Sequence, residues 1–244
     1  MNKNVIVLTH GWTGSSVFTA LLGRAGYWLG DQTFQKIDYD THENAELVAL
    51  NKRMLVDLGY EGDHERDFVT LDTLEKLVER SKDIDLAPYR EFVEKCQSSS
   101  HRPWIWKDPR LTWTIRIWAQ MLPLDEISFV ILTRDREQAW ISSNLRRHIQ
   151  SRAYTKRYND KITSSLKQFL QDNNCPYTEF EFEDLQLQPS QTIDTLNSHL
   201  GVNLSMDDLT SVYTKPLFKK SKNSWDKLVA LAIYLKNYGQ RDNR

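Results

Sequence analysis

A run of glycine, threonine and serine residues follows the first apolar segment of the chain and could bind an anion. The apolar segment, VIVLT, occupies residues 5–9, and HGWTGSS follows it up to Ser16. A helical pattern comes next, so the glycine turn joins a predicted strand to a predicted helix. Such a turn directs several backbone N–H groups to one point, where the helix dipole adds partial positive charge. This order of elements is typical of a phosphate or sulfate site, but an ordinary turn that binds nothing has the same outline.

Charged residues lie at or just after the ends of three later segments that are also predicted to be strands. Lys107 is the last residue of PWIWK, and Arg134 follows ISFVILT. Glu183 follows a third segment, YTEFEF. Ligands of parallel sheets bind at the carboxyl ends of the strands, so the two cations should lie near the glycine turn and suit a ligand with more than one anionic group. The alternative is that charges gather at strand ends only because loops are solvated.

The elements that must position these residues alternate between strand and helix. Strands are predicted at 4–9, 103–107, 127–133 and 177–182, and helices at 14–26, 43–58, 71–80, 86–96, 111–121, 136–150 and 225–238. Strands that helical crossovers separate form a parallel sheet with helices on both faces. We therefore predict an α/β protein with three layers and a mostly parallel sheet. The expected organisation is a single domain, residues 1–244, with a helical insertion at about 36–100 and a helical C-terminal segment at about 188–244.

Composition excludes several classes of protein. The 244 residues are 40% hydrophobic and 27% charged, and the formal net charge is −1. That balance gives no general positive field for nucleic acid or an anionic membrane, so an anion site must be local and no nucleic-acid partner is expected. Cys96 and Cys175 do not make a disulfide framework or a zinc motif. No window approaches the ~20 apolar residues of a membrane span and none resembles a signal peptide, so we predict a cytoplasmic protein.

Two familiar motifs do not fit. A nucleotide-hydrolysing P-loop needs G-x-x-x-x-G-K-[ST], and the glycine turn of this chain lacks that lysine. HGWTG at residues 10–14 is similar to the oxyanion loop of an α/β-hydrolase. That fold also requires a G-x-S-x-G nucleophile elbow, which is absent from the sequence.

The chain resembles the family of sulfotransferases that use 3′-phosphoadenosine 5′-phosphosulfate (PAPS), in particular its bacterial members. In that family the first strand leads into a glycine loop for the 5′-phosphosulfate, usually a basic residue followed by S-G-T-[ST]. The matching residues here are Trp12, Thr13, Gly14, Ser15 and Ser16. Three further segments support the resemblance, namely ILTRDREQAWISS, WKDPRL and FEFEDLQLQP. The resemblance implies a sulfotransferase fold related to that of the P-loop NTPases.

The resemblance also implies how PAPS is bound as co-substrate, without a metal. Residues 12–16 would hold the 5′-phosphosulfate, and Arg134 and Ser142 would hold the 3′-phosphate. If the helix begins near Asp135, Ser142 lies about two turns into it, roughly 10 Å along the axis. A long guanidinium spans most of that gap and grips phosphate with its planar fork. The alternative is that Arg134 pairs with a nearby carboxylate and Ser142 only caps the helix or faces solvent.

The implied reaction is in-line transfer of a sulfuryl group to a hydroxyl or amine. Lys107 would stabilise the transferring group, or else form a structural salt bridge with a neighbour. Glu43 or His42 would take the proton of the acceptor, and His10 is a further candidate. The acceptor class stays open among small molecules, carbohydrates, lipids and peptides.

Trp12 departs from the family pattern, because a basic residue usually occupies its position. Loss of one charge-assisted contact to the leaving phosphate would cost about 2–4 kcal/mol of transition-state stabilisation. Lys107 or another cation would have to supply that charge. Otherwise the protein is a non-catalytic relative that binds the nucleotide, or a small-molecule kinase with a P-loop-like fold. Lys219, Lys220 and Lys222 could close over the nucleotide, although such a run is more often a solvated face.

Overall fold

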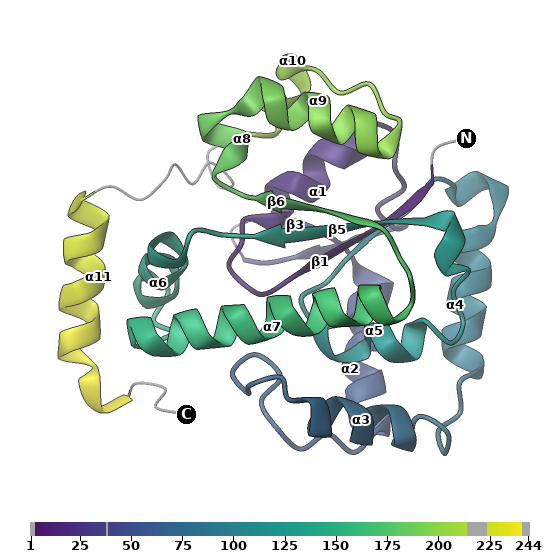
Figure 1. Ribbon diagram of the computed structural model, residues 1–244, viewed down its shortest axis with the longest axis horizontal. Coiled ribbons are helices and arrows are strands. Elements are labelled where there is room, and N and C mark those ends of the chain that lie inside the picture. The colour runs from purple at the N-terminus through teal and green to yellow at the C-terminus, as the bar shows by residue number, and fades with distance from the viewer. Residues whose placement is uncertain (1–2, 38, 214–223, 241–244) are drawn as a thin grey trace.

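The computed structural model describes residues 3–37, 39–213 and 224–240 and has a parallel sheet at its centre (Figure 1). The sheet has the strand order β4-β1-β5-β6, with each neighbouring pair parallel. Its strands are β1 (Asn4–Thr9), β4 (Ile105–Lys107), β5 (Ile127–Thr133) and β6 (Tyr177–Glu181). A separate antiparallel hairpin consists of β2 (Thr33–Gln35) and β3 (Asp40–Asn44). Because β1 lies between β4 and β5, the turn after β1 lies in the middle of the sheet's carboxyl edge.

Helices cover both faces of the sheet (Figure 1). One face carries α2 (Ala45–Asp57), α3 (Leu71–Arg80), α4 (Ala87–Gln97), α5 (Leu111–Trp118) and α7 (Arg152–Asp172). The other face carries α1 (Ser15–Arg24), α8 (Asp184–Leu187), α9 (Pro189–Leu200) and α10 (Met206–Val212). At one side α6 (Arg136–Leu145) packs against α11 (Ser224–Lys236), and short 3₁₀ turns lie at Ser99–His101, Leu124–Glu126 and Tyr238–Gln240. The predicted three-layer α/β fold is confirmed.

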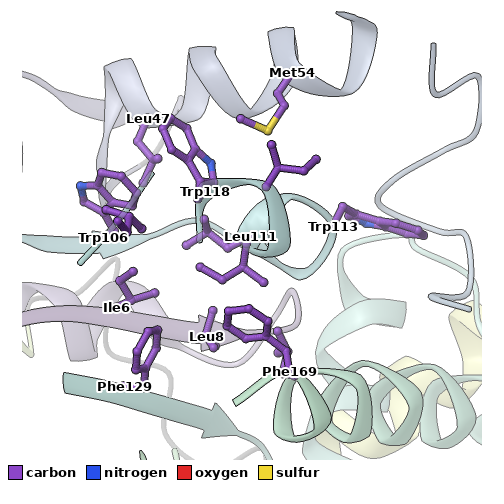
Figure 2. Close-up of a cluster of buried hydrophobic side chains, with 14 of the residues drawn as sticks. Ile6, Leu8, Leu47, Met54, Trp106, Leu111, Trp113, Trp118, Phe129 and Phe169 are labelled. Atoms are coloured by element: carbon purple, nitrogen blue, oxygen red, sulfur yellow. The ribbon is translucent and has the colours of Figure 1, made fainter. Parts of the chain in front are cut away.

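Alternation along β1 builds the two hydrophobic layers. Ile6 and Leu8 belong to the core on one face of the sheet, and Val5 and Val7 belong to the core on the other. Successive side chains point to opposite faces because a strand has a period of two. All four are completely buried, since helices cover both faces. Figure 2 shows Ile6 and Leu8 beside Phe129 of β5, between the strands and the covering helices. Each such side chain contributes roughly 1.5–3 kcal/mol through burial, so the sheet is a firm support for the residues at its carboxyl edge.

The start of α2 differs from the prediction. The sequence predicts one helix over residues 43–58, whereas α2 begins at Ala45. Asn44 sets this start, because its side chain accepts hydrogen bonds from the backbone N–H groups of Glu46 and Leu47. Glu43 therefore lies in β3, and the segment predicted as a helical insertion begins with a hairpin.

The end of α6 also differs from the prediction. The helix predicted over 136–150 ends at Leu145, and Arg147 has a left-handed φ of 63°. The chain turns back there, so that the indole N–H of Trp140 donates to the carbonyl of Gln150 at 2.8 Å. The long helix α7 was not among the predicted elements, because its first half contains few apolar residues.

Cys96 and Cys175 are free thiols, and both are buried. In the described part of the chain, no helix combines the length and the apolar content needed to cross a membrane. Lys219, Lys220 and Lys222 lie outside the described residues.

One buried amide joins α2 to the end of β4 and to α5. Asn51 is completely buried, and its Nδ2 donates to Oδ2 of Asp108 at 2.9 Å. Its Oδ1 accepts from the hydroxyl of Thr114 at 2.7 Å and from the indole N–H of Trp118 at 2.8 Å. Asn51 therefore satisfies three buried polar groups at once and holds α2 beside the residues that follow β4.

We expect Asn51→Leu to lower the free energy of unfolding by about 3 kcal/mol or more, because several buried polar groups lose their partner together. Thr114→Val is the matched comparison, since it removes one donor and leaves the Asn51 carbonyl bonded to Trp118. It should cost only about 1 kcal/mol. Urea unfolding followed by tryptophan fluorescence measures both values. Equal losses in the two variants would contradict a central role for Asn51.

Candidate functional site

A cavity of about 620 Å³ lies at the carboxyl edge of the sheet. Its wall includes residues that follow β1, β4 and β5, together with parts of the β2–β3 hairpin and of α6. Nine of the ten predicted site residues line it, namely Trp12, Thr13, Gly14, Ser15, Ser16, Glu43, Lys107, Arg134 and Ser142. His42 does not. The sheet therefore brings segments from distant parts of the sequence to one cavity of the size that small-molecule ligands use, about 300–1,000 Å³.

The glycine turn between β1 and α1 has the backbone of an anion-binding loop. Trp12 and Gly14 both have left-handed conformations, with φ values of 69° and 78°. A Cβ atom at Gly14 would lie 2.4 Å from the ring of Phe182, which is 1% exposed, so only glycine fits there. Within the described residues, no hydrogen bond uses the backbone N–H groups of residues 12–16 as donors. Open amides at the start of a helix are the feature that binds phosphate or sulfate.

Arg134 lies beside this turn in a buried ion pair. Its Nε donates to Oε1 of Glu183 at 3.2 Å, and its Nη1 donates to the carbonyl of Trp12 at 2.7 Å. Its Nη2 is buried and has no hydrogen-bond partner in the described part of the chain. Burial lowers the pKa of the guanidinium, and Glu183 opposes that shift. Arg134 therefore combines the predicted alternative, pairing with a carboxylate, with one donor that is still open.

Ser142 supplies a second open donor. It lies in α6 and is 5% exposed, and its hydroxyl has no hydrogen-bond partner among the residues described. Buried hydroxyls and guanidinium N–H groups nearly always have partners, because an unsatisfied one costs about 1–3 kcal/mol or more. Arg134 and Ser142 line the same cavity. Two buried residues that line one cavity and each have a donor without a partner are the arrangement that an anionic hydrogen-bond acceptor, such as a phosphate, would satisfy.

Lys107 and Glu43 form a second buried ion pair. The Nζ of Lys107 lies 2.6 Å from Oε1 of Glu43, and their side chains are only 2% and 7% exposed. No hydrogen bond to Oε2 of Glu43 is found within the described residues. Asp108, the neighbour of Lys107 in sequence, pairs instead with Arg110 at 2.9 Å, and burial raises its pKa. Two of the three residues predicted to act in catalysis, Lys107 and Glu43, therefore contact each other in the cavity wall.

The two histidines differ in position. His42 has a left-handed φ of 53°, lies 3.8 Å from the carboxylate of Asp40, and is not in the cavity wall. His10 lines the cavity, is 2% exposed, and contacts the carbonyl of Gly11 through Nδ1 at 2.7 Å. Because a carbonyl only accepts, Nδ1 carries the proton. Burial lowers the pKa of His10 to about 4, and the nearby charge of Arg134 acts in the same direction. His10 is therefore neutral at physiological pH.

Several cations of the cavity wall lie outside the sequence motifs. Lys36 comes from the β2–β3 turn, Lys52 from α2, and Arg146 from the end of α6. None belongs to a recognisable motif, and the hairpin itself was not predicted. Among the described residues, no group of three or more His, Cys, Asp or Glu side chains is arranged to hold a metal ion. The cavity wall is therefore rich in cations as well as in open backbone amides.

Comparison with known proteins supports this fold. No protein-family model and no curated protein sequence matches the chain. The sulfotransferase domain from the curacin biosynthetic pathway aligns over 93% of this chain and 82% of that domain, with a TM-score of 0.51 and 13% identity. The sulfotransferase domain of the Synechococcus PCC 7002 olefin synthase has a TM-score of 0.47 and 17% identity, and the alignment covers 92% of this chain and 82% of that domain. Sulfotransferase STF9 from Mycobacterium avium has a TM-score of 0.48 and 12% identity, and the alignment covers 100% of this chain and 78% of that protein.

At these identities the likeness is one of fold. The curacin domain carries that conclusion, since its TM-score is 0.51 over 93% of this chain. The chain has the sulfotransferase fold, with the parallel sheet and the glycine turn placed as its resemblance to that family predicts.

We expect the burial of His10 to make the protein less stable as the pH falls. Its pKa is about 4 in the folded protein and near 6.5 in the unfolded chain, so the unfolded state binds the proton first. Between about pH 7.5 and pH 5, this difference should remove about 2 kcal/mol of the free energy of unfolding. His10→Asn keeps a donor for the Gly11 carbonyl and should lose correspondingly less over the same range. Urea titrations at each pH test this, and parallel pH curves for the two proteins would contradict it.

Proposed function

We propose that this protein is a sulfotransferase that takes a sulfuryl group from PAPS and transfers it to a hydroxyl or amine. The observation that carries the proposal is the pair of orphaned donors, Nη2 of Arg134 and Oγ of Ser142. Arg134 and Ser142 line the same cavity as the residues of the glycine turn. We further propose that the chain acts as a single domain, residues 1–244.

The distribution of donors favours a nucleotide that is phosphorylated at two separate positions. The amides of residues 13–16 would hold the 5′-phosphosulfate, where the dipole of α1 adds positive charge. Arg134 and Ser142 would hold the 3′-phosphate with a guanidinium fork and a hydroxyl. ATP carries phosphate only on its 5′ side and would leave Arg134 Nη2 and Ser142 Oγ without a partner.

The ion pair of Lys107 and Glu43 is the proposed catalytic group. Bound PAPS would supply an activated sulfuryl group. One oxygen of Glu43 is occupied by Lys107, and Oε2 is the proposed acceptor for the proton of the incoming hydroxyl or amine. Lys107 would place positive charge beside the oxygens on which negative charge develops. His42 has no role in this proposal, because it lies outside the cavity wall.

Aromatic residues of the wall suit an acceptor with a flat or apolar surface. Trp12, Tyr39 and Trp113 line the cavity together with the lysine and glutamate of the ion pair. Such rings bind sugars and phenols by contact with their faces. We therefore propose a small molecule, a carbohydrate, a lipid or a peptide that presents a hydroxyl or amine as the acceptor.

Calorimetry with PAP, the desulfated product, tests the nucleotide site. We expect PAP to bind more tightly than ATP, and Ser142→Ala to weaken PAP about tenfold while leaving 5′-AMP unchanged, since only the contact to the 3′-phosphate is lost. Ser143→Ala is the matched control, because the Ser143 hydroxyl is bonded to the carbonyl of Trp140 and does not line the cavity. No heat with PAP, or ATP binding more tightly than PAP, would refute the proposal.

The catalytic assignment predicts different effects on stability and on turnover. Lys107→Ala leaves Glu43 charged and buried without a partner, which should cost about 3–5 kcal/mol of folding stability. Adding Glu43→Gln removes that charge and should restore most of the stability. Neither the single variant nor the double variant should transfer label from PAPS to p-nitrophenol, glucosamine or a tyrosine peptide above about 1% of the wild-type rate. A double variant that is both stable and fully active would refute the assignment, whereas a wild-type protein that binds PAP but transfers no label would be a non-catalytic relative.

A further inference from the structure

The cations of the cavity wall fall into two groups. The first group is paired with buried or partly buried carboxylates, as Lys107–Glu43, Arg110–Asp108 and Arg134–Glu183. The second group, Lys36, Lys52 and Arg146, has no ion pair within residues 3–37, 39–213 and 224–240. Within the described residues, no carboxylate therefore neutralises the charge of the second group.

Lys36 and Arg146 both lie near the ring of Trp12, although they come from distant elements. The Nζ of Lys36 lies 5.7 Å from the centre of the Trp12 ring, and the guanidinium carbon of Arg146 lies 5.2 Å from it. Both cations also contact the ring of Tyr39, at 5.8 Å and 5.6 Å. Two like charges on the same two rings repel each other, and cation–π contacts return only about 0.5–1 kcal/mol each. An anion beside them would remove this repulsion.

The position of Trp12 indicates that this anion is the one that the glycine turn would bind. Its carbonyl accepts a hydrogen bond from Arg134. Trp12 is also the first of residues 12–16, whose backbone N–H groups are open. Lys52, by contrast, lies over the ring of Phe34, 5.2 Å from its centre, and not over Trp12. Lys36 and Arg146 are thus the unpaired cations of the described wall that contact the anion loop itself.

We propose that Lys36 and Arg146, held on the rings of Trp12 and Tyr39, form a cationic clamp for the 5′-phosphate or phosphosulfate of the nucleotide. The clamp supplies the charge that a basic side chain at position 12 would otherwise carry. It rests on the proposed PAPS-binding function and assigns two residues to one end of that nucleotide. Lys52 has no part in the clamp.

Ligands that lack one phosphate separate the two ends of the nucleotide. PAP carries both phosphates, 3′-AMP lacks the one at the 5′ position, and 5′-AMP lacks the one at the 3′ position. We expect Lys36→Met and Arg146→Met each to weaken PAP about tenfold and to change the affinity for 3′-AMP less than about twofold. Arg146→Lys keeps the charge and should stay within about threefold of the wild-type affinity for PAP. Lys52→Met is the control and should leave the affinities for both ligands unchanged.

Each result of these titrations decides the question. If the wild-type protein does not bind PAP, the proposed function fails and the clamp fails with it. If the wild-type protein binds PAP more tightly than 3′-AMP and both variants keep the wild-type affinities for the two ligands, only the clamp is wrong. Equal losses of PAP and 3′-AMP would assign Arg146 and Lys36 to the 3′-phosphate and would overturn the proposal. Circular dichroism of each variant shows whether it is folded. If Arg146→Met does not fold, the comparison of Arg146→Lys with the wild-type protein still tests whether the positive charge at this position is what binds PAP.

Discussion

The buried guanidinium of Arg134 ties the ends of three strands together, and the shape of the site depends on it. Arg134 follows β5, its partner Glu183 follows β6, and its other acceptor, the carbonyl of Trp12, follows β1. The second oxygen of Glu183 accepts the backbone N–H of Asp135, which caps α6. A buried charge of this kind is tolerated only when hydrogen bonds surround it. Because Nη2 alone has no partner in the described part of the chain, the interactions that hold the guanidinium also leave one donor for a ligand.

Lys107 and Glu43 are also buried charges that need a partner, and they satisfy this requirement by pairing with each other. The pair joins the end of β4 to the β2–β3 hairpin, and Asn51 and Asp108 anchor α2 behind it. Desolvation makes either charge costly alone, so the pair holds the hairpin against the sheet as well as bringing a carboxylate to the cavity. The structural role of this ion pair is therefore compatible with its proposed chemical role. The same contact that makes Lys107 part of a salt bridge places it beside a candidate base.

Much of the fold could be predicted, because strong local patterns mark its parts. β1 and β5 contain the apolar runs VIVL and FVIL, and the glycine turn and the cap at Asp135 have clear sequence signals. The β2–β3 hairpin could not be found, because TFQ and DTHEN are short, polar and partly exposed. The pair of Lys107 and Glu43 joins residues 64 positions apart, and no local pattern announces such a contact. The unpredicted parts of the site thus depend on tertiary packing.

At Trp12, tertiary packing brings cations to a loop position where the residue itself is not basic. A bulky residue with a φ of 69° costs about 1–2 kcal/mol, and such strain persists where surrounding contacts hold it. Here the carbonyl is held by Arg134, and the ring contacts His148 at 4.8 Å, Arg146 and Lys36. A lysine at position 12 would itself be charged. The tryptophan is neutral, and its ring instead contacts Lys36 from the hairpin and Arg146 from the end of α6. The proposed anion site would be complete only after those two elements have docked, so its charge would be a property of the folded protein and not of the loop sequence.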